Sequence, residues 1–392
     1  MRPPPKKTRG APPSAGFDPW LLAAVLLLTV FGLVMVYSAS AVTAQVKVHD
    51  QFYFLKRQLV AAGIGLGLLL LSLQLGYRRL EPVAAPLLLA VLGALALVLV
   101  PGVGRVAGGA RRWIDLGVIS FQPAEAAKVV LVLYLARSLA RKKERMRIFS
   151  IGFLPHVLVT GLLVALVLAE KDLGTAVILL LILFVMLFAG GVPIGYLVGA
   201  ALLSAPVAWK LVAGTPYRMQ RIQAFLDPWQ HRDGSGFQIV ESLIGIGNGG
   251  FSGQGLGEAK SKLFYLPAAH TDFIAAVIAE EAGLVGTALL LALFALLVWR
   301  GMRATWRAPD AFGCYLALGL TTLFGAQALV NVAVVFGLLP TKGLTLPFVS
   351  YGGSSLMTLL AAAGILLSVS GGGGGFLSAP RAGRLAAAGG TP

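Results

Sequence analysis

Long apolar runs separated by short polar or Gly/Pro-rich breaks dominate the pattern of this sequence. A helix needs about 20 mostly apolar residues to cross the hydrocarbon core of a bilayer. We expect such helices near 20–41, 57–75, 82–100, 123–139, 152–169, 173–189, 192–212, 273–299, 311–336 and 355–370. The predicted fold class is therefore an all-α polytopic membrane protein with about ten transmembrane helices.

The composition agrees with this prediction. Hydrophobic residues make up 57% of the chain and charged residues only 12%, whereas soluble chains carry about 25% charged residues. The first apolar run is longer than the 7–15 residues typical of a signal peptide, so we interpret it as a retained first span. The one cysteine, Cys314, excludes an internal disulfide.

The charges predict an orientation. The net charge is +16, but the cations lie mostly at the ends of apolar runs, as topology signals do, so no nucleic-acid partner is predicted. Basic clusters at 78–79, 137–147 and 300–307 fall on the same side as the basic N-terminus. The positive-inside rule makes that side cytoplasmic. Both termini are then cytoplasmic, and a large outer loop joins spans 7 and 8.

The two ends of the chain differ from its middle. Residues 1–17 are Pro-rich and basic, and residues 371–392 are rich in Gly and Ala. Such compositions do not bury enough apolar surface to fold. We expect a disordered basic cytoplasmic tail, a membrane domain over 18–370 and a disordered C-terminal cytoplasmic tail.

Asp272 lies at the predicted start of the eighth span, on the outer side. One interpretation is a helix N-cap, which accepts free backbone N–H groups. The other is a general base held at a rigid helix end. The helix dipole would keep the carboxylate ionised, and desolvation by the covering loop would restore its basicity.

Glu125 and Lys128 lie within the fourth predicted span, three positions apart and hence on one helix face. Charges in a span cost about 2.5–3.5 kcal/mol each on insertion scales, so they usually pair or line a cavity. The two side chains could neutralise each other. Asp172 is an alternative partner for Lys128.

Several cations run against the positive-inside bias because they lie on the outer side. They are Arg111, Arg112, Arg218, Arg221 and Lys342. They could pair with acidic side chains or lipid headgroups, or they could bind a diphosphate, which suits Arg and Lys. Trp113 is either an interfacial anchor or a platform for a sugar ring.

No His/Cys cluster has the spacing of a metal site, and the Gly-rich segments match no nucleotide-binding motif. The residues alone predict an outward-facing polar cavity with a carboxylate and basic groups. Such a cavity suits a lipid-linked anionic substrate.

Several stretches resemble the motifs of the SEDS (shape, elongation, division and sporulation) family. They are Arg112-Trp113-Ile114 with Glu125 and Lys128, Asp172-Leu173-Gly174-Thr175, His270-Thr271-Asp272 and the segment 339–355. The resemblance extends from about residue 18 to 370. Residues 342–345 resemble division-type members more than elongation-type members.

The resemblance implies an activity and a set of site residues. The activity is polymerisation of lipid II onto a nascent glycan strand at the outer face of the bacterial inner membrane, at the division septum, with release of undecaprenyl diphosphate. Asp272 is the expected catalytic carboxylate. The expected substrate-binding residues are Arg112, Trp113, Arg218, Arg221, Lys342 and Ser354. The expected supporting residues are Glu125, Lys128, Asp172 and Glu280.

The resemblance also implies partners. They are a class B penicillin-binding transpeptidase (FtsI-like), division regulators of the FtsQLB and FtsN types, and membrane lipids. No cofactor is certain; a divalent cation (Mg²⁺ or Mn²⁺) beside the diphosphate is compatible with the chemistry, although no protein cage for it is visible.

Three alternatives stay open: a lipid II flippase, an elongation-type polymerase and a division scaffold without activity. A flippase needs a polar path through the bilayer, whereas a polymerase needs only an outer site. The polar residues gather on one face, which favours the polymerase.

Overall fold

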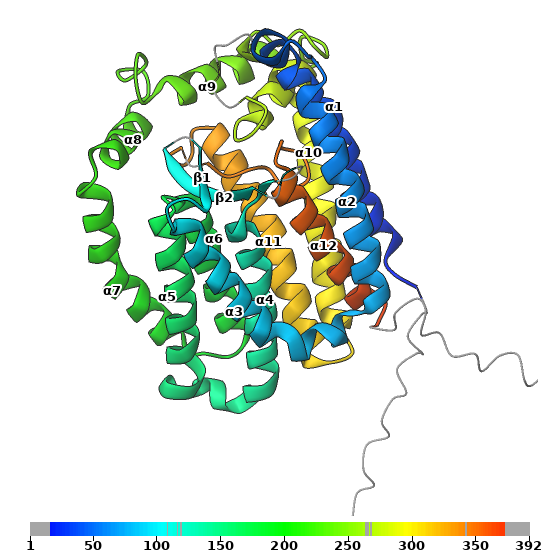
Figure 1. The fold of residues 1–392 in the computed structure, drawn as a ribbon, viewed down its shortest axis with the longest axis vertical. Coiled ribbons are helices and arrows are strands. Elements are labelled where there is room, and N and C mark those ends of the chain that lie inside the picture. Colours follow the sequence, from blue (N-terminus) through cyan, green and yellow to red (C-terminus); the bar gives the residue numbers. More distant parts are fainter. Residues whose placement is uncertain are drawn as a thin grey trace, which may run out of the picture.

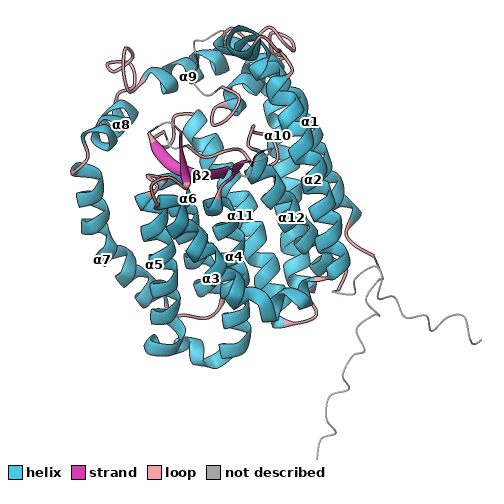
Figure 2. Ribbon diagram, in the orientation of Figure 1, coloured by secondary structure: helices cyan, strands magenta, loops and turns pink. Residues whose placement is uncertain are grey.

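The computed structural model describes residues 16–107, 109–115, 117, 120–262, 266, 269–341 and 343–372. The predicted tails, 1–17 and 371–392, fall almost entirely outside these residues. Helices dominate the described chain and run side by side as a bundle (Figures 1 and 2).

Each of the ten apolar runs forms a helix. Their bounds are α1 (Pro19–Val48), α2 (Tyr53–Leu75), α3 (Leu80–Leu99), α4 (Pro123–Lys142), α5 (Leu154–Ala169), α6 (Leu173–Ala189), α7 (Ile194–Ala213), α10 (Ile274–Arg307), α11 (Ala311–Val335) and α12 (Gly353–Ser370). Short helices η1 (Tyr77–Arg79), η2 (Lys143–Arg147) and η3 (Phe149–Phe153) lie between them.

Seven helices of the described chain are long and apolar enough to cross a membrane: α1, α2, α3, α5, α10, α11 and α12, with α3 and α5 extended by η1 and η3. Helix α6 and the first part of α7 are shorter apolar helices, and α4 carries charged residues. The chain is a multi-pass α-helical membrane protein, as predicted. The exact number of spans stays a prediction.

The two ends of the membrane domain meet at one end of the bundle. The Asp18 side chain caps α1 by accepting from the backbone N–H groups of Trp20 and Leu21, at 3.1 and 3.2 Å. Its backbone N–H donates to Ser370 Oγ at 3.0 Å, and its carboxylate accepts from Arg300 Nε at 2.8 Å. We call this the terminal end and the opposite one the cavity end.

Helix α12 is buried within the bundle and packs closely on α2. A Cβ atom on Gly364 would lie 2.2 Å from the Leu69 carbonyl oxygen, and one on Gly65 would lie 2.6 Å from Leu360 Cδ1. Small residues at such crossings let helix backbones approach closely in membranes. This contact fixes the position of the segment that precedes α12, which forms part of the cavity described below.

The cavity end carries elements that the apolar pattern did not predict. Strands β1 (Gly104–Ala107), β2 (Ala110–Asp115) and β3 (Ser120–Phe121) form an antiparallel sheet in the order β1-β2-β3, so the fold is not purely helical. The long loop between α7 and α10 contains α8 (Pro216–Leu226) and α9 (Phe237–Gly249). These two helices arch over the cavity end, and α7 leans away from the bundle (Figure 1).

Helix α10 is interrupted where the long loop docks on it. Gly283 has φ 62° and ψ −159°, in a region that favours glycine. The loop fills the interruption: Gln254 N donates to Glu280 O and Leu284 N to Gly250 O, both at 3.0 Å. The start of α10, next to Asp272, is therefore held by the loop as well as by neighbouring helices.

Candidate functional site

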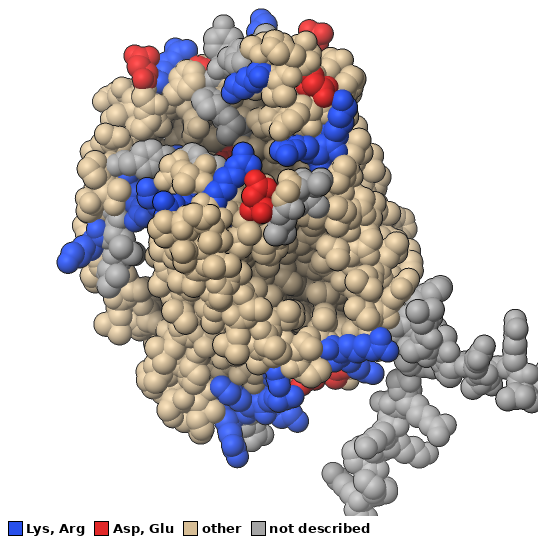
Figure 3. All heavy atoms as spheres, in the orientation of Figure 1, with Lys and Arg blue, Asp and Glu red and all other residues tan. Residues whose placement is uncertain are grey.

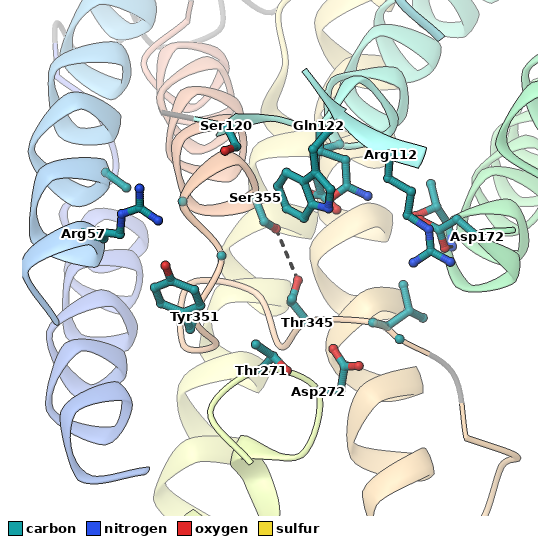
Figure 4. A pocket seen from close by; sticks show the side chains of 18 of the residues that line it. Arg57, Arg112, Ser120, Gln122, Asp172, Thr271, Asp272, Thr345, Tyr351 and Ser355 are labelled. Carbon is teal, nitrogen blue, oxygen red and sulfur yellow. Dashed lines mark hydrogen bonds between the residues drawn. The ribbon is translucent and has the colours of Figure 1, made fainter. Parts of the chain in front are cut away.

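A cavity of about 660 Å³ lies at the cavity end of the bundle. Helices α2, α4 and α6, the small sheet, the residues before α10 and the segment before α12 all contribute to its wall. Figure 4 shows its polar side chains, among them Arg57, Arg112, Asp172, Asp272, Thr345 and Tyr351. Segments far apart in the sequence thus meet around one space.

Asp272 lies two residues before α10 begins and points into the cavity (Figure 4). The N-cap interpretation is wrong: the capping position is Phe273, and no side chain caps the helix. Asn331 Nδ2 donates to the backbone carbonyl of Asp272 at 2.9 Å and holds the main chain. Among the described residues, no donor contacts the Asp272 carboxylate, so it is free to accept a proton.

The surroundings of Asp272 raise its basicity. Burial, and then the nearby Asp172 carboxylate, raise the pKa of its carboxyl to about 6, against the opposing effects of Arg112 and Arg221. A Cβ atom on Gly343 would lie 3.3 Å from Asp272 Oδ2, so a glycine at this position leaves room for the carboxylate. The group is thus mostly ionised at neutral pH and still a stronger base than an exposed aspartate.

Arg112, on β2, faces the cavity but also holds the turn between α5 and α6. Its Nε donates to Glu170 O at 2.9 Å and its Nη2 to Lys171 O at 2.7 Å. An arginine has five N–H donors, so three remain for a ligand. The neighbouring Trp113 also lines the cavity.

Asp172 caps α6. Its Oδ1 accepts from Thr175 N at 3.0 Å, and its Oδ2 from Thr175 Oγ1 at 2.9 Å. It is therefore not the partner of Lys128, and that alternative is wrong. Its charge still acts on Asp272, since both residues line the cavity.

Lys128 pairs within its own helix, as the spacing predicted. Its Nζ lies 2.9 Å from Glu125 Oε1 and is completely buried. It also donates to Gln327 Oε1 of α11 at 2.9 Å, and Gln327 Nε2 donates to Thr345 O at 3.0 Å. The second oxygen of Glu125 is buried without a partner among the described residues, and Glu125 lines the cavity.

Other predicted residues lie further from the cavity. Ser354 is buried and accepts from Gln122 N at 3.0 Å; its neighbour Ser355 lines the cavity instead. Glu280 accepts from Lys260 N at 2.9 Å and Ser261 N at 3.2 Å, so it anchors the long loop.

The remaining predicted cations belong to the covering loops. Arg221, on α8, donates from Nη1 to Thr341 O at 2.9 Å and so links α8 to the segment before α12. Arg218 lies on the same helix. Lys342 lies outside the described residues.

Three further cations line the cavity and were not predicted from the sequence: Lys56 and Arg57 on α2 and Arg105 on β1. Arg57 faces the cavity from the side opposite Arg112 and Asp172 (Figure 4). Lys56 and Arg57 fell at the predicted edge of the second span and were not counted as loop charges. Their position on the side predicted to be the outer one, against the positive-inside bias, is the signal that could have identified them.

The charges in the cavity are of both signs. Four cations and the carboxylates of Glu125, Asp172 and Asp272 face one space. Within the described part of the chain, no group of three or more His, Cys, Asp or Glu side chains is arranged to hold a metal ion. The arrangement can bind an anionic group at its cations while Asp272 takes up a proton.

Comparison with known structures shows the same fold. A structure described as "Structural coordination of polymerization and crosslinking by a peptidoglycan synthase complex" aligns with a TM-score of 0.74 and 38% identity, over 90% of this chain and 97% of that one. The Thermus thermophilus rod shape determining protein RodA aligns with a TM-score of 0.67 and 34% identity, over 90% of this chain and 96% of that one.

Comparison with known sequences gives the family. A protein named "Probable peptidoglycan glycosyltransferase FtsW" from Geobacter sulfurreducens is 48% identical over 344 residues, 88% of this chain and 92% of the relative. Stage V sporulation protein E of Bacillus subtilis is 42% identical over 343 residues, 88% of this chain and 94% of the relative. The FtsW/RodA/SpoVE family model, described as "Cell cycle protein", matches residues 19–372. The chain therefore belongs to the FtsW/RodA/SpoVE family of cell cycle proteins and is most like its FtsW members.

Proposed function

We propose that this chain is a peptidoglycan glycosyltransferase that polymerises lipid II at the outer face of the bacterial inner membrane during cell division. The observation that carries the proposal is the free carboxylate of Asp272 in a cavity whose walls also hold four cations. The relatives' names describe the same activity. The cavity lies at the end of a membrane bundle, where a lipid-linked substrate presents its polar head.

In this mechanism Asp272 acts as the general base. Its carboxylate accepts the proton of the 4-hydroxyl of the acceptor's N-acetylglucosamine. The hydroxyl oxygen then forms a bond to the anomeric carbon at the lipid-bearing end of the growing strand. The bond from that carbon to the diphosphate oxygen breaks, and undecaprenyl diphosphate leaves with the electron pair. A base whose pKa lies near the working pH suits this step.

The cavity cations stabilise the leaving group. The diphosphate gains negative charge as its bond to the sugar breaks, and positioned cations in a partly desolvated site favour such charge. Arg57, Arg105 and Lys56 line the cavity, and Arg112 retains three N–H donors after its two backbone bonds. We assign these four cations to the diphosphate. Trp113, which also lines the cavity, would pack against a sugar ring.

We also propose that a divalent cation binds to the diphosphate of the substrate. Mg²⁺ is commonly bound by one or two carboxylates together with substrate phosphates. Asp172 lines the cavity and is the carboxylate that would help to hold the ion, which leaves Asp272 free as the base. Such an ion would offset the negative charge of the diphosphate.

Partners complete the proposed setting. The structure described as a peptidoglycan synthase complex coordinates polymerisation with crosslinking. We propose that this chain likewise works with a class B penicillin-binding transpeptidase at the division septum, under regulators of the FtsQLB and FtsN types.

The experiment that tests the reaction uses the full chain with its transpeptidase in proteoliposomes that contain labelled lipid II. A polymerase releases undecaprenyl diphosphate and forms glycan strands, which are separated by length on a gel. A flippase exposes lipid II on the other leaflet without forming strands, and a chemical label applied from outside detects that exposure. Exposure of lipid II without strands would replace the polymerase by the flippase. If neither strands nor exposure were detected, the scaffold would be favoured.

A further inference from the structure

A second cavity, of about 650 Å³, lies at the terminal end of the bundle, far from Asp272. The end of α4, the start of η2, the link between α6 and α7 and the start of α11 enclose it. Its lining includes Leu139, Lys143, Met146, Arg147, Gly191 and Tyr315. None of these residues has a part in the glycosyltransferase mechanism.

The two cations of this cavity are available to a ligand. Lys143 and Arg147 are exposed, and neither side chain forms an ion pair or hydrogen bond with a described residue. Neighbouring cations are engaged: Arg141 pairs with Glu81 at 3.2 Å, and Lys142 donates to Ile151 O at 2.8 Å. The cavity thus gathers two exposed cations of this segment, whereas Arg141 and Lys142 beside them are held by the protein.

The backbone around the cavity has unusual conformations at two positions and a close contact at a third. Lys143 has φ 43°, in the left-handed region that non-glycine residues rarely adopt. This conformation ends α4 and turns the chain into η2. On the opposite wall, a Cβ atom on Gly190 would lie 2.5 Å from Leu139 Cδ2, and Gly191 has φ 83°. Unusual conformations of this kind concentrate at functional sites.

The chemistry of the lining selects an amphipathic anion. Lys and Arg suit a phosphate group, whereas Leu139 and Met146 are apolar and Tyr315 offers both a ring and a hydroxyl. A soluble phosphate compound would gain nothing from the apolar wall. The cavity is formed where helices of a membrane bundle end, at the depth of lipid headgroups. Figure 3 shows further Lys and Arg side chains gathered at this end of the molecule.

We propose that this cavity binds the phosphate group of an anionic phospholipid from the leaflet at the terminal end, with Lys143 and Arg147 as its contacts. Basic pockets between membrane helices on the cytoplasmic side are known to bind such headgroups. The proposal does not depend on the reaction at Asp272. It gives the protein a lipid site separate from its substrate cavity.

The test is native mass spectrometry of the full chain in neutral detergent, titrated with phosphatidylglycerol or with zwitterionic phosphatidylcholine. The wild-type protein is expected to retain phosphatidylglycerol more strongly. The double variant Lys143→Gln/Arg147→Gln should lose about thirtyfold in affinity, from two contacts at the lipid surface. The control Arg79→Gln/Arg145→Gln removes two exposed charges at the same end, outside the cavity lining, and should change the affinity less than about threefold.

Two further comparisons distinguish a lipid from a soluble phosphate compound and show which result would overturn the proposal. Inorganic phosphate in large excess is expected to leave the bound lipid in place; its displacement of the lipid would assign the site to a soluble phosphate compound instead. Equal losses in both double variants would overturn the proposal, because the effect would then be one of net charge. Gel filtration and polymerisation of lipid II check that each variant is folded.

Discussion

Lys128 and Gln327, 199 positions apart in the chain, share a hydrogen bond of 2.9 Å between Nζ and Oε1. Because Lys128 also pairs with Glu125 at 2.9 Å, one buried ammonium joins α4 to α11 directly beneath the cavity. Gln327 continues the connection to the Thr345 carbonyl in the cavity wall. The floor of the site is therefore a fixed polar network that ties α4 and α11 to the cavity wall.

Removing the Lys128 charge should destabilise the protein strongly. Lys128→Met leaves the Glu125 carboxylate buried without compensation, which typically costs about 3–5 kcal/mol. The double variant Glu125→Gln/Lys128→Met removes both charges and should recover most of this loss. Thermal unfolding in detergent measures the difference. Equal stability of the single and double variants would show that the two charges do not depend on each other.

A charge-swapped pair, in contrast, should not restore stability. Glu125→Lys/Lys128→Glu would place a carboxylate against Gln327 Oε1, an acceptor in the present arrangement. The neutral double variant is thus the better test of coupling.

Replacing a cation that lines the cavity should lower kcat/KM for lipid II more than it lowers stability. Arg57→Gln removes a charge opposite Arg112, and a lost hydrogen bond to a charged group costs about 1.5–3 kcal/mol. We expect kcat/KM for lipid II to fall about 10–100-fold without a change in thermal stability. Arg111→Gln, on the same strand as Arg112 but outside the cavity lining, is the matched control. A similar loss in both variants would contradict the assignment.

Glu170 gives a prediction about stability and pH. Both of its carboxylate oxygens are buried without a partner among the described residues. Burial, and then the nearby Asp172, raise the pKa of Glu170 from 4.5 to about 8, against an opposing effect of Arg112. Between these two values the unfolded chain has lost this proton and the folded chain keeps it. Stability therefore falls as pH rises from about 4.5 to 8, by at most about 1.4 kcal/mol per pH unit.

Glu170→Gln should remove this dependence, so the variant gains stability over the wild type as pH increases. Its backbone carbonyl still accepts from Arg112. Glu258→Gln, which alters an exposed carboxylate, should leave the slope unchanged. Unfolding followed from pH 5 to 8 checks this; parallel curves for wild type and Glu170→Gln would refute it.

The pH dependence of the reaction should follow the ionisation of the Asp272 carboxyl group. Its carboxyl has a pKa of about 6 because of burial and then Asp172, and the base must be ionised to act. Polymerisation should fall about tenfold per pH unit below that value and level off above it. Single-turnover rates from pH 4.5 to 8 measure the profile. A rate that stays constant down to pH 4.5 would exclude a base with this pKa.

The sequence predicted the helices well because most of them are apolar runs long enough to cross a bilayer. It did not predict the small sheet, since its strands are two to six residues long and show no sustained alternation. Nor did it predict the interruption of α10 at Gly283, which depends on a docked loop about thirty residues earlier in the chain.

The cavity was predicted in part. Arg112, Asp172 and Asp272 line it because short polar segments at one face of a bundle must lie close together. Asp172 was a plausible partner for Lys128 by charge alone, but the true second partner is the uncharged Gln327 on a distant helix. Ser354 and Ser355 are adjacent, and only the direction of the first turn of α12 decides which faces the cavity.

Asp272 is proposed as the catalytic base. The most direct test compares glycan strand formation by the wild-type protein and by Asp272→Asn, each with its transpeptidase in proteoliposomes with labelled lipid II. Asparagine keeps the size of the side chain, and no described donor depends on the carboxylate, so the variant should fold and insert normally. We expect strands from the wild type and at least about a thousandfold slower polymerisation from the variant. Strand formation by the folded variant at near wild-type rates would contradict it.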